Sequence, residues 1–164
     1  MEPQIRNWIL NELSHTRPEY ADLPACPYAK PGLLNNSIYF WRADPQQPVF
    51  DSLREMAIAL PGWEHTTACV YFEHSVTAHT LWRAVEQFDA QYPQYLAFVS
   101  DPEDWTGEPG GSTIAPPPCL IVNIHWAKAV ADLRCTLWLS GYYRNWSRDE
   151  LDSIDYLTNK VDNS

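Results

Sequence analysis

The chain has 164 residues, a net charge of −10 and a pI near 4.7, with 45% hydrophobic and 20% charged side chains. This composition is typical of a globular protein rather than a disordered one, and the length suits a single domain, residues 1–164, whose last few residues fray. An acidic surface repels phosphate backbones, and no segment gathers Lys and Arg among aromatic residues. Nucleic acids are therefore not expected partners.

Neither the N-terminus nor the cysteines indicate export. MEPQIRNWIL lacks the apolar stretch of a signal peptide, and no run approaches the roughly 18 apolar residues of a membrane span. We therefore expect a cytoplasmic protein with no membrane partner and with reduced thiols. The cysteines form no CxxC pair, which argues against a zinc knuckle or a thioredoxin motif; they are Cys26, Cys69, Cys119 and Cys135.

The first third of the chain predicts a helix, a long loop and a strand. Residues 3–15 carry apolar side chains at helical spacing, and Pro3 suits a first turn. Residues 16–36 contain four prolines and read as irregular but packed, because aromatic and apolar residues recur in them. Residues 37–44, SIYFWRAD, are rich in aromatic side chains and predict a strand.

The middle of the chain alternates between helix and strand. Residues 50–60 predict a helix opened by a capping box of Ser52 and Glu55, and residues 66–74 predict a strand. A second amphipathic helix over 77–92 precedes a strand over 95–100.

The last third begins with an acidic loop, DPEDWTGEPGG, read as a solvated turn with the alternative role of a mobile lid. Residues 116–126 predict a buried strand, and 127–141 predict a helix that ends at a glycine. A box of Ser147 and Glu150 opens a final helix over 148–159. The order α-β-α-β-α-β-β-α-α predicts an α/β (α+β) sandwich, a layer of about four strands covered by helices.

One motif resembles a known family. Trp8 in the first helix is followed by Cys26-Pro27-Tyr28-Ala29-Lys30, similar to the Cys-Pro-Phe-Ala-Lys/Arg motif of an uncharacterised bacterial family, a domain of unknown function. TTACVYFEH and APPPCLIV also resemble segments of that family. The chain departs from it where the family carries histidines, at Ser100-Asp101-Pro102 and at Ile121 or Val122. The resemblance supplies no reaction.

Cys26 and Lys30 are the first candidate site residues. Prolines on both sides stiffen the segment around Cys26, and a lysine four residues on lowers a thiol's pKa if the loop folds back. The alternative is that Cys26 is a small apolar side chain that anchors the loop.

Histidines and an aspartate near strand ends form the second group of candidates. If the second and fourth strands are parallel neighbours, His74 and His125 share the carboxyl end of the sheet, with His79 close by. Asp101, after the third strand, joins them if that strand has the same direction. Three histidines match an iron or zinc ligand set, whereas the alternative is ordinary polar residues at element ends.

These observations favour a small cytoplasmic enzyme or enzyme-like protein that acts on a small molecule. Its site lies at the Cys26 loop and the carboxyl rim of the sheet, with Cys26, Lys30, His125 and Asp101 as candidate catalytic residues. The alternative is a non-catalytic accessory protein that binds a protein partner through aromatic surface patches. The sequence identifies no cofactor, reaction or oligomeric state.

Overall fold

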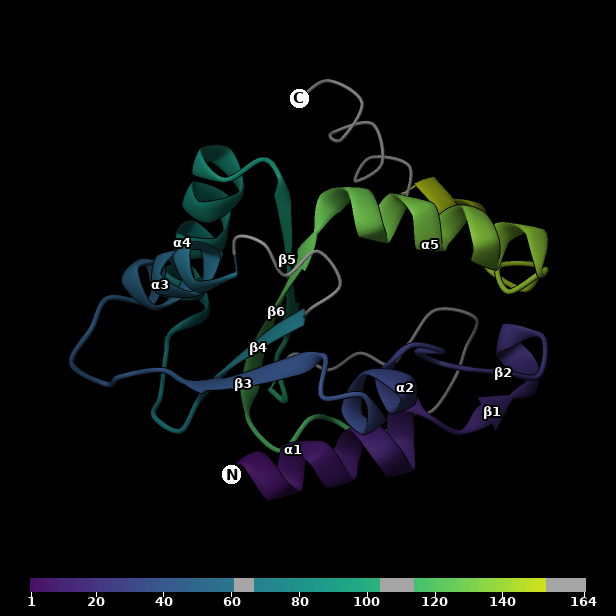
Figure 1. Ribbon diagram of the computed structural model, residues 1–164, viewed down its shortest axis with the longest axis horizontal. Coiled ribbons are helices and arrows are strands. Elements are labelled where there is room, and N and C mark those ends of the chain that lie inside the picture. Colours follow the sequence, from purple (N-terminus) through teal and green to yellow (C-terminus); the bar gives the residue numbers. More distant parts are fainter. Residues whose placement is uncertain (61–66, 104–113, 153–164) are drawn as a thin grey trace.

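A four-stranded mixed sheet forms the centre of the computed structural model, which describes residues 1–60, 67–103 and 114–152 (Figure 1). The strands lie in the order β3-β4-β6-β5, with β3 and β4 parallel and β6 antiparallel to both of its neighbours. The predicted sandwich of helices around about four strands is confirmed. The strands are β3 (Ile38–Arg42), β4 (Thr67–Phe72), β5 (Tyr95–Ser100) and β6 (Leu120–Trp126).

Helices α3 (Val49–Ala59) and α4 (Ala78–Gln91) lie side by side on one face of the sheet (Figure 1). Helix α4 starts where the Thr77 hydroxyl accepts a hydrogen bond from the Thr80 backbone N–H. The apolar stripes of both helices pack on alternate strand residues because side chains of a strand point to its two faces in turn. This core includes Leu53, Met56, Leu81, Phe88, Val70, Val122 and Ile124.

Helices α1 (Glu2–Trp8) and α2 (Ala29–Leu34) cover part of the opposite face. Helix α1 continues into a π-helical turn, η1 (Ile9–Leu13). The Trp8 indole N–H donates a 2.7 Å hydrogen bond to the carbonyl of Ala115, which ties α1 to the segment that leads into β6. The second core joins α1, η1 and α2 to the sheet through Ile5, Trp8, Ile9, Ala29, Cys69, Tyr71, Cys119 and Ile121.

Helix α5 (Ala127–Leu139) follows β6 directly and extends along the same side of the sheet as α1 and α2 (Figure 1). Near it lies a two-stranded antiparallel sheet of β1 (Thr16–Arg17) and β2 (Leu23–Pro24), joined by the 3-10 turn η2 (Pro18–Tyr20). Packing of aromatic rings links these parts of the chain, with the Tyr20 and Tyr142 rings stacked at 5.0 Å. The third core contains Tyr20, Ile114, Tyr142 and Tyr143.

Most of the predicted elements agree with the observed ones, but residues 16–36, predicted as irregular, contain α2, β1 and β2, and the strand predicted over 116–126 begins only at Leu120. The predicted strand 95–100 coincides with β5, and the helices predicted over 50–60, 77–92 and 127–141 differ from α3, α4 and α5 by at most two residues at either end. None of the helices in the described ranges combines the length and apolar character needed to cross a membrane.

Of the two predicted capping boxes, one is present and one is wrong. Ser147 and Glu150 exchange both hydrogen bonds of the box, and helical structure begins at residue 148, directly after Ser147; the predicted end of this helix lies outside the described residues. Ser52 instead lies inside α3 and is buried, because Pro48 is the N-cap. The lid suggested for the acidic loop also falls mostly outside the described residues, which leave out 104–113.

Candidate functional site

The segment that contains Cys26 is ordered and packed on both sides. The Cys26 N–H donates to the Leu13 carbonyl at 2.9 Å, which docks the loop on the end of η1. From the other side the Tyr142 hydroxyl donates to the Ala25 carbonyl. Cys26 itself is partly buried against the second core. The loop is therefore a fixed structural feature that joins the first helix to the turn after α5.

Lys30 lies in different surroundings from Cys26. It is exposed and lines a hollow of about 370 Å³ at the end of η1, together with Leu10, Ser14, His15 and Thr16. Cys26 packs inward and is not among the residues of this hollow. This arrangement does not support the idea that Lys30 lowers the pKa of the Cys26 thiol. A functional role for Cys26 stays a prediction.

His125 lies at the end of β6, opposite Thr67 at the start of β4. Its Nδ1 atom is 3.1 Å from the Thr67 Oγ1, and its ring meets the ring of Phe98 edge to face at 5.4 Å. Burial, with a smaller contribution from the positive charge of Arg134, lowers the pKa of His125 to about 4. The imidazole is therefore neutral at pH 7.

A second polar side chain, Asn123, shares the face of β6 that carries His125. It is opposite Cys69 in register and is half-buried, whereas Val122 and Ile124, on the other face of the same strand, are fully buried. Polar groups in the middle of an inner strand cost free energy unless partners satisfy them. Asn123 and His125 therefore form a polar patch on the face of β6 opposite the first core.

The charge of Arg134 acts on Tyr143 as well as on His125. Burial raises the pKa of Tyr143; the nearby charge of Arg134 opposes that rise and Tyr28 adds to it. Tyr28 belongs to the Cys26 loop, and burial and then Cys26 raise its own pKa. We name Thr67, Asn123, His125, Arg134 and Tyr143 the His125 cluster. It combines the imidazole and hydroxyl that are in contact, an amide on the same face of β6, and a guanidinium and a phenol that are linked to them by their electrostatic effects.

The predicted convergence of His74, His79 and His125 is wrong. It required parallel β4 and β6, whereas the two strands are antiparallel, so His74 and His125 lie at opposite ends of the sheet. His74 packs edge to face on Phe72 at 5.8 Å, and His79 is exposed in the first turn of α4. The described residues contain no group of three His, Cys, Asp or Glu side chains arranged to hold a metal ion.

Asp101 does not lie near His125 either. It follows β5, whose last residue, Ser100, pairs with Ile121. His125 lies four positions after Ile121 along β6, which corresponds to about 13 Å at roughly 3.3 Å per residue. The Asp101 carboxylate instead accepts a 2.9 Å hydrogen bond from the Glu103 N–H within its own turn. Asp101 is therefore separated from His125, and a site shared by His125 and Cys26 stays a prediction.

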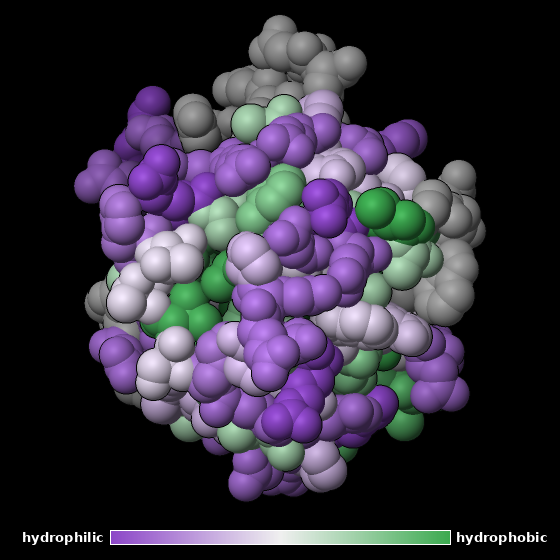
Figure 2. All heavy atoms as spheres, turned by 90° about the vertical axis from the view of Figure 1, so that its left-hand side faces the viewer, coloured by the Kyte–Doolittle hydropathy of each residue, from purple (hydrophilic) through white to green (hydrophobic). Residues whose placement is uncertain are grey.

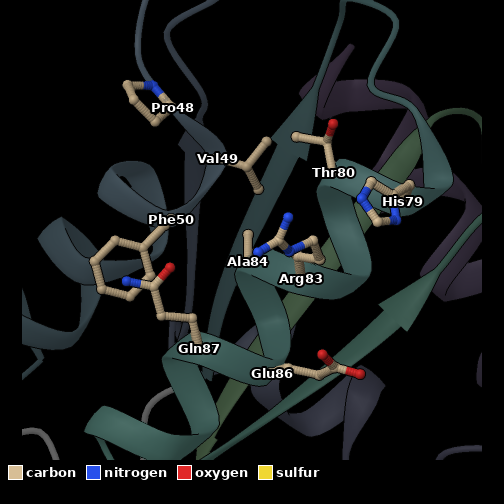
Figure 3. A pocket seen from close by; sticks show the side chains of 9 residues that line it. All are labelled: Pro48, Val49, Phe50, His79, Thr80, Arg83, Ala84, Glu86 and Gln87. Carbon is tan, nitrogen blue, oxygen red and sulfur yellow. The ribbon is translucent and has the colours of Figure 1, made fainter.

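Sequence reasoning missed a second hollow, of about 630 Å³, between the start of α3 and the outer face of α4 (Figure 3). Only His79 among its residues was a candidate, and for a different reason. Arg83 lies one turn after His79 on α4, and this spacing of two basic side chains on an exposed helix face was the available signal. We name this hollow of about 630 Å³ the α3–α4 hollow.

Comparison of the chain with protein-family models, with curated proteins and with solved structures found no match. The resemblance to the family with the Cys-Pro-Phe-Ala-Lys/Arg motif therefore stays a prediction.

Proposed function

We propose that the protein binds and acts on a small polar molecule at the His125 cluster, as a small enzyme or enzyme-like protein. One observation carries the proposal: the hydrogen-bonded pair of Thr67 and His125, at one end of the two inner strands, shares the face of β6 with the half-buried Asn123. Its four free thiols favour a reducing compartment such as the cytoplasm.

The chemistry of the cluster suits hydrogen bonding and orientation more than strong base catalysis. With a pKa of about 4, His125 is a weak base at pH 7, but its neutral ring offers one donor and one acceptor. The bond between Nδ1 and Thr67 fixes the ring orientation and leaves Nε2 for a ligand. The positive charge of Arg134 beside the ring favours a ligand that carries a negative or strongly polar group.

A library of small polar metabolites, screened by shifts in the thermal unfolding temperature, tests this proposal. Compounds that stabilise the wild type are expected to lose that effect in Asn123→Leu and in His125→Gln, which remove a ligand contact each. His74→Gln is the matched control because His74 lies at the other end of the sheet. A set of stabilising compounds whose effects survive both cluster variants contradicts the proposal.

A second candidate is an accessory protein that binds a protein partner through aromatic side chains. The end of α5 favours it: Trp138 is 61% exposed and Leu139 is 87% exposed. As neighbours in the chain they place two large apolar side chains together on the surface, and a partner-binding patch uses side chains of this kind. Recovery of a defined partner by the wild type and by Trp82→Ser, but not by Trp138→Ser, would support the accessory role over the small-molecule role.

A further inference from the structure

The α3–α4 hollow has the composition of a ligand site. Its volume of about 630 Å³ falls in the range of small-molecule pockets. Its apolar part comes from Val49 and Ala84, which are almost fully buried, and from Phe50, which packs against the first core. On this side of the molecule hydrophobic side chains form small patches enclosed by hydrophilic ones (Figure 2). The hollow therefore offers an apolar surface with a polar border.

Arg83 supplies the charge of the hollow. Its side chain comes from α4 and is one of those that line the hollow (Figure 3). It forms no salt bridge with a carboxylate in the described part of the chain, whereas Arg6, Arg42 and Arg54 each do. The chain has 21 Asp and Glu against 11 Lys and Arg, so carboxylate partners are in excess. An arginine held away from them is suited to an external anion.

The other polar side chains complete the border of the hollow. His79 lies one turn before Arg83, and the Gln87 amide lies one turn after it, so all three follow one face of α4. Glu86 is the one acidic residue among those that line the hollow, and its carboxylate points away from Phe50 and Gln87 (Figure 3). Among the residues that line the hollow, Arg83 is therefore the one Lys or Arg and Glu86 the one carboxylate.

We propose that the α3–α4 hollow binds a carboxylate that carries a short apolar tail. The guanidinium fork of Arg83 holds the carboxylate through two parallel hydrogen bonds, with the Gln87 amide as a further donor. The tail contacts Val49, Phe50 and Ala84. The site lies on the face of the sheet opposite the His125 cluster, so this inference is independent of the function proposed there.

An NMR titration of the whole protein with hexanoate tests the proposal, with acetate and inorganic phosphate as anions that lack a tail. Hexanoate is expected to shift the backbone amide signals of residues 49–50 and 79–87 and to bind at least tenfold more weakly to Arg83→Gln. Arg83→Lys, which keeps the charge and loses the fork, is expected to be intermediate. Arg54→Gln, on the exposed side of α3, is the control and is expected to bind as the wild type does.

Three results would overturn the proposal. One is equal affinity of Arg83→Gln and wild type for hexanoate, which removes the role of the guanidinium. Another is affinity for acetate or phosphate as high as that for hexanoate, which removes the apolar contact. The third is a pattern of shifted signals outside the hollow. Because Arg83 is exposed, its substitution leaves the fold intact, and the amide spectrum of each variant verifies this.

Discussion

The low pKa of His125 makes a quantitative prediction about the pH dependence of stability. In the unfolded chain the imidazole titrates near its usual pKa of 6.5, whereas in the folded protein it titrates near 4. Between these two values the unfolded state binds more protons than the folded state. The free energy of unfolding therefore rises with pH across this window; this contribution is fully present above pH 6.5 and is lost as the pH falls toward 4.

The size of the effect follows from the two pKa values. A shift from 6.5 to about 4 corresponds to about 3 kcal/mol in total, and most of it is lost between pH 7 and pH 4.5. His125→Gln keeps a side chain that hydrogen-bonds Thr67 but cannot titrate. The wild type is therefore expected to lose about 2–3 kcal/mol more than this variant over that interval.

Urea unfolding of the wild type, His125→Gln and His74→Gln at a series of pH values measures this difference. Carboxylates that titrate in the same range affect all three proteins alike and cancel in the comparison. His74→Gln is expected to follow the wild type. If wild type and His125→Gln lose stability in parallel, the buried neutral imidazole at the end of β6 is refuted.

Three further predictions concern stability and thiol chemistry. Ser52→Ala is expected to raise the free energy of unfolding by about 1 kcal/mol, because the buried Ser52 hydroxyl has no protein partner in the described residues and Ala favours a helix. A loss of stability in urea unfolding would contradict this prediction. Thr77→Ala is expected to lower it by about 1 kcal/mol through loss of the α4 cap, and an unchanged midpoint would show that the cap contributes nothing. In native protein at pH 8, Cys135 is expected to react with a thiol reagent before Cys69 and Cys119, because Cys135 is exposed. Burial raises the pKa of Cys69 to about 12 and that of Cys119 to about 11. Rapid labelling of Cys69 or Cys119 would contradict their burial.

The sequence pattern was sufficient for the elements whose periodicity is strong. The face of Leu81, Val85 and Phe88 fixed the position of α4, and the apolar run before His125 identified β6 as an inner strand. Helix α2 gave no such signal, because Pro31 and Gly32 lie inside it and normally indicate a turn. Local pattern predicts an element well when its apolar period is long enough to dominate single residues.

The candidate site depended on strand direction, which the local sequence does not contain. The apolar run of β6 is compatible with either direction beside β4, and antiparallel pairing moved His125 to Thr67 and away from His74. The antiparallel pairing of β5 with β6 likewise separated Asp101 from His125. The effect of Arg134 on the pKa of His125 was equally hidden, because Arg134 belongs to α5, the helix that follows β6. Tertiary arrangement, rather than residue type, decided which candidates came together.

The nitrogen resonances of the His125 imidazole give the most direct test of the proposed small-molecule site. Nitrogen-labelled protein is compared with and without a compound that stabilises it in the thermal screen. The account predicts that the Nε2 resonance of His125 moves on binding, because this atom faces the ligand while Nδ1 stays with Thr67. Saturating binding that leaves the His125 resonances unchanged, and shifts signals elsewhere, would contradict the account.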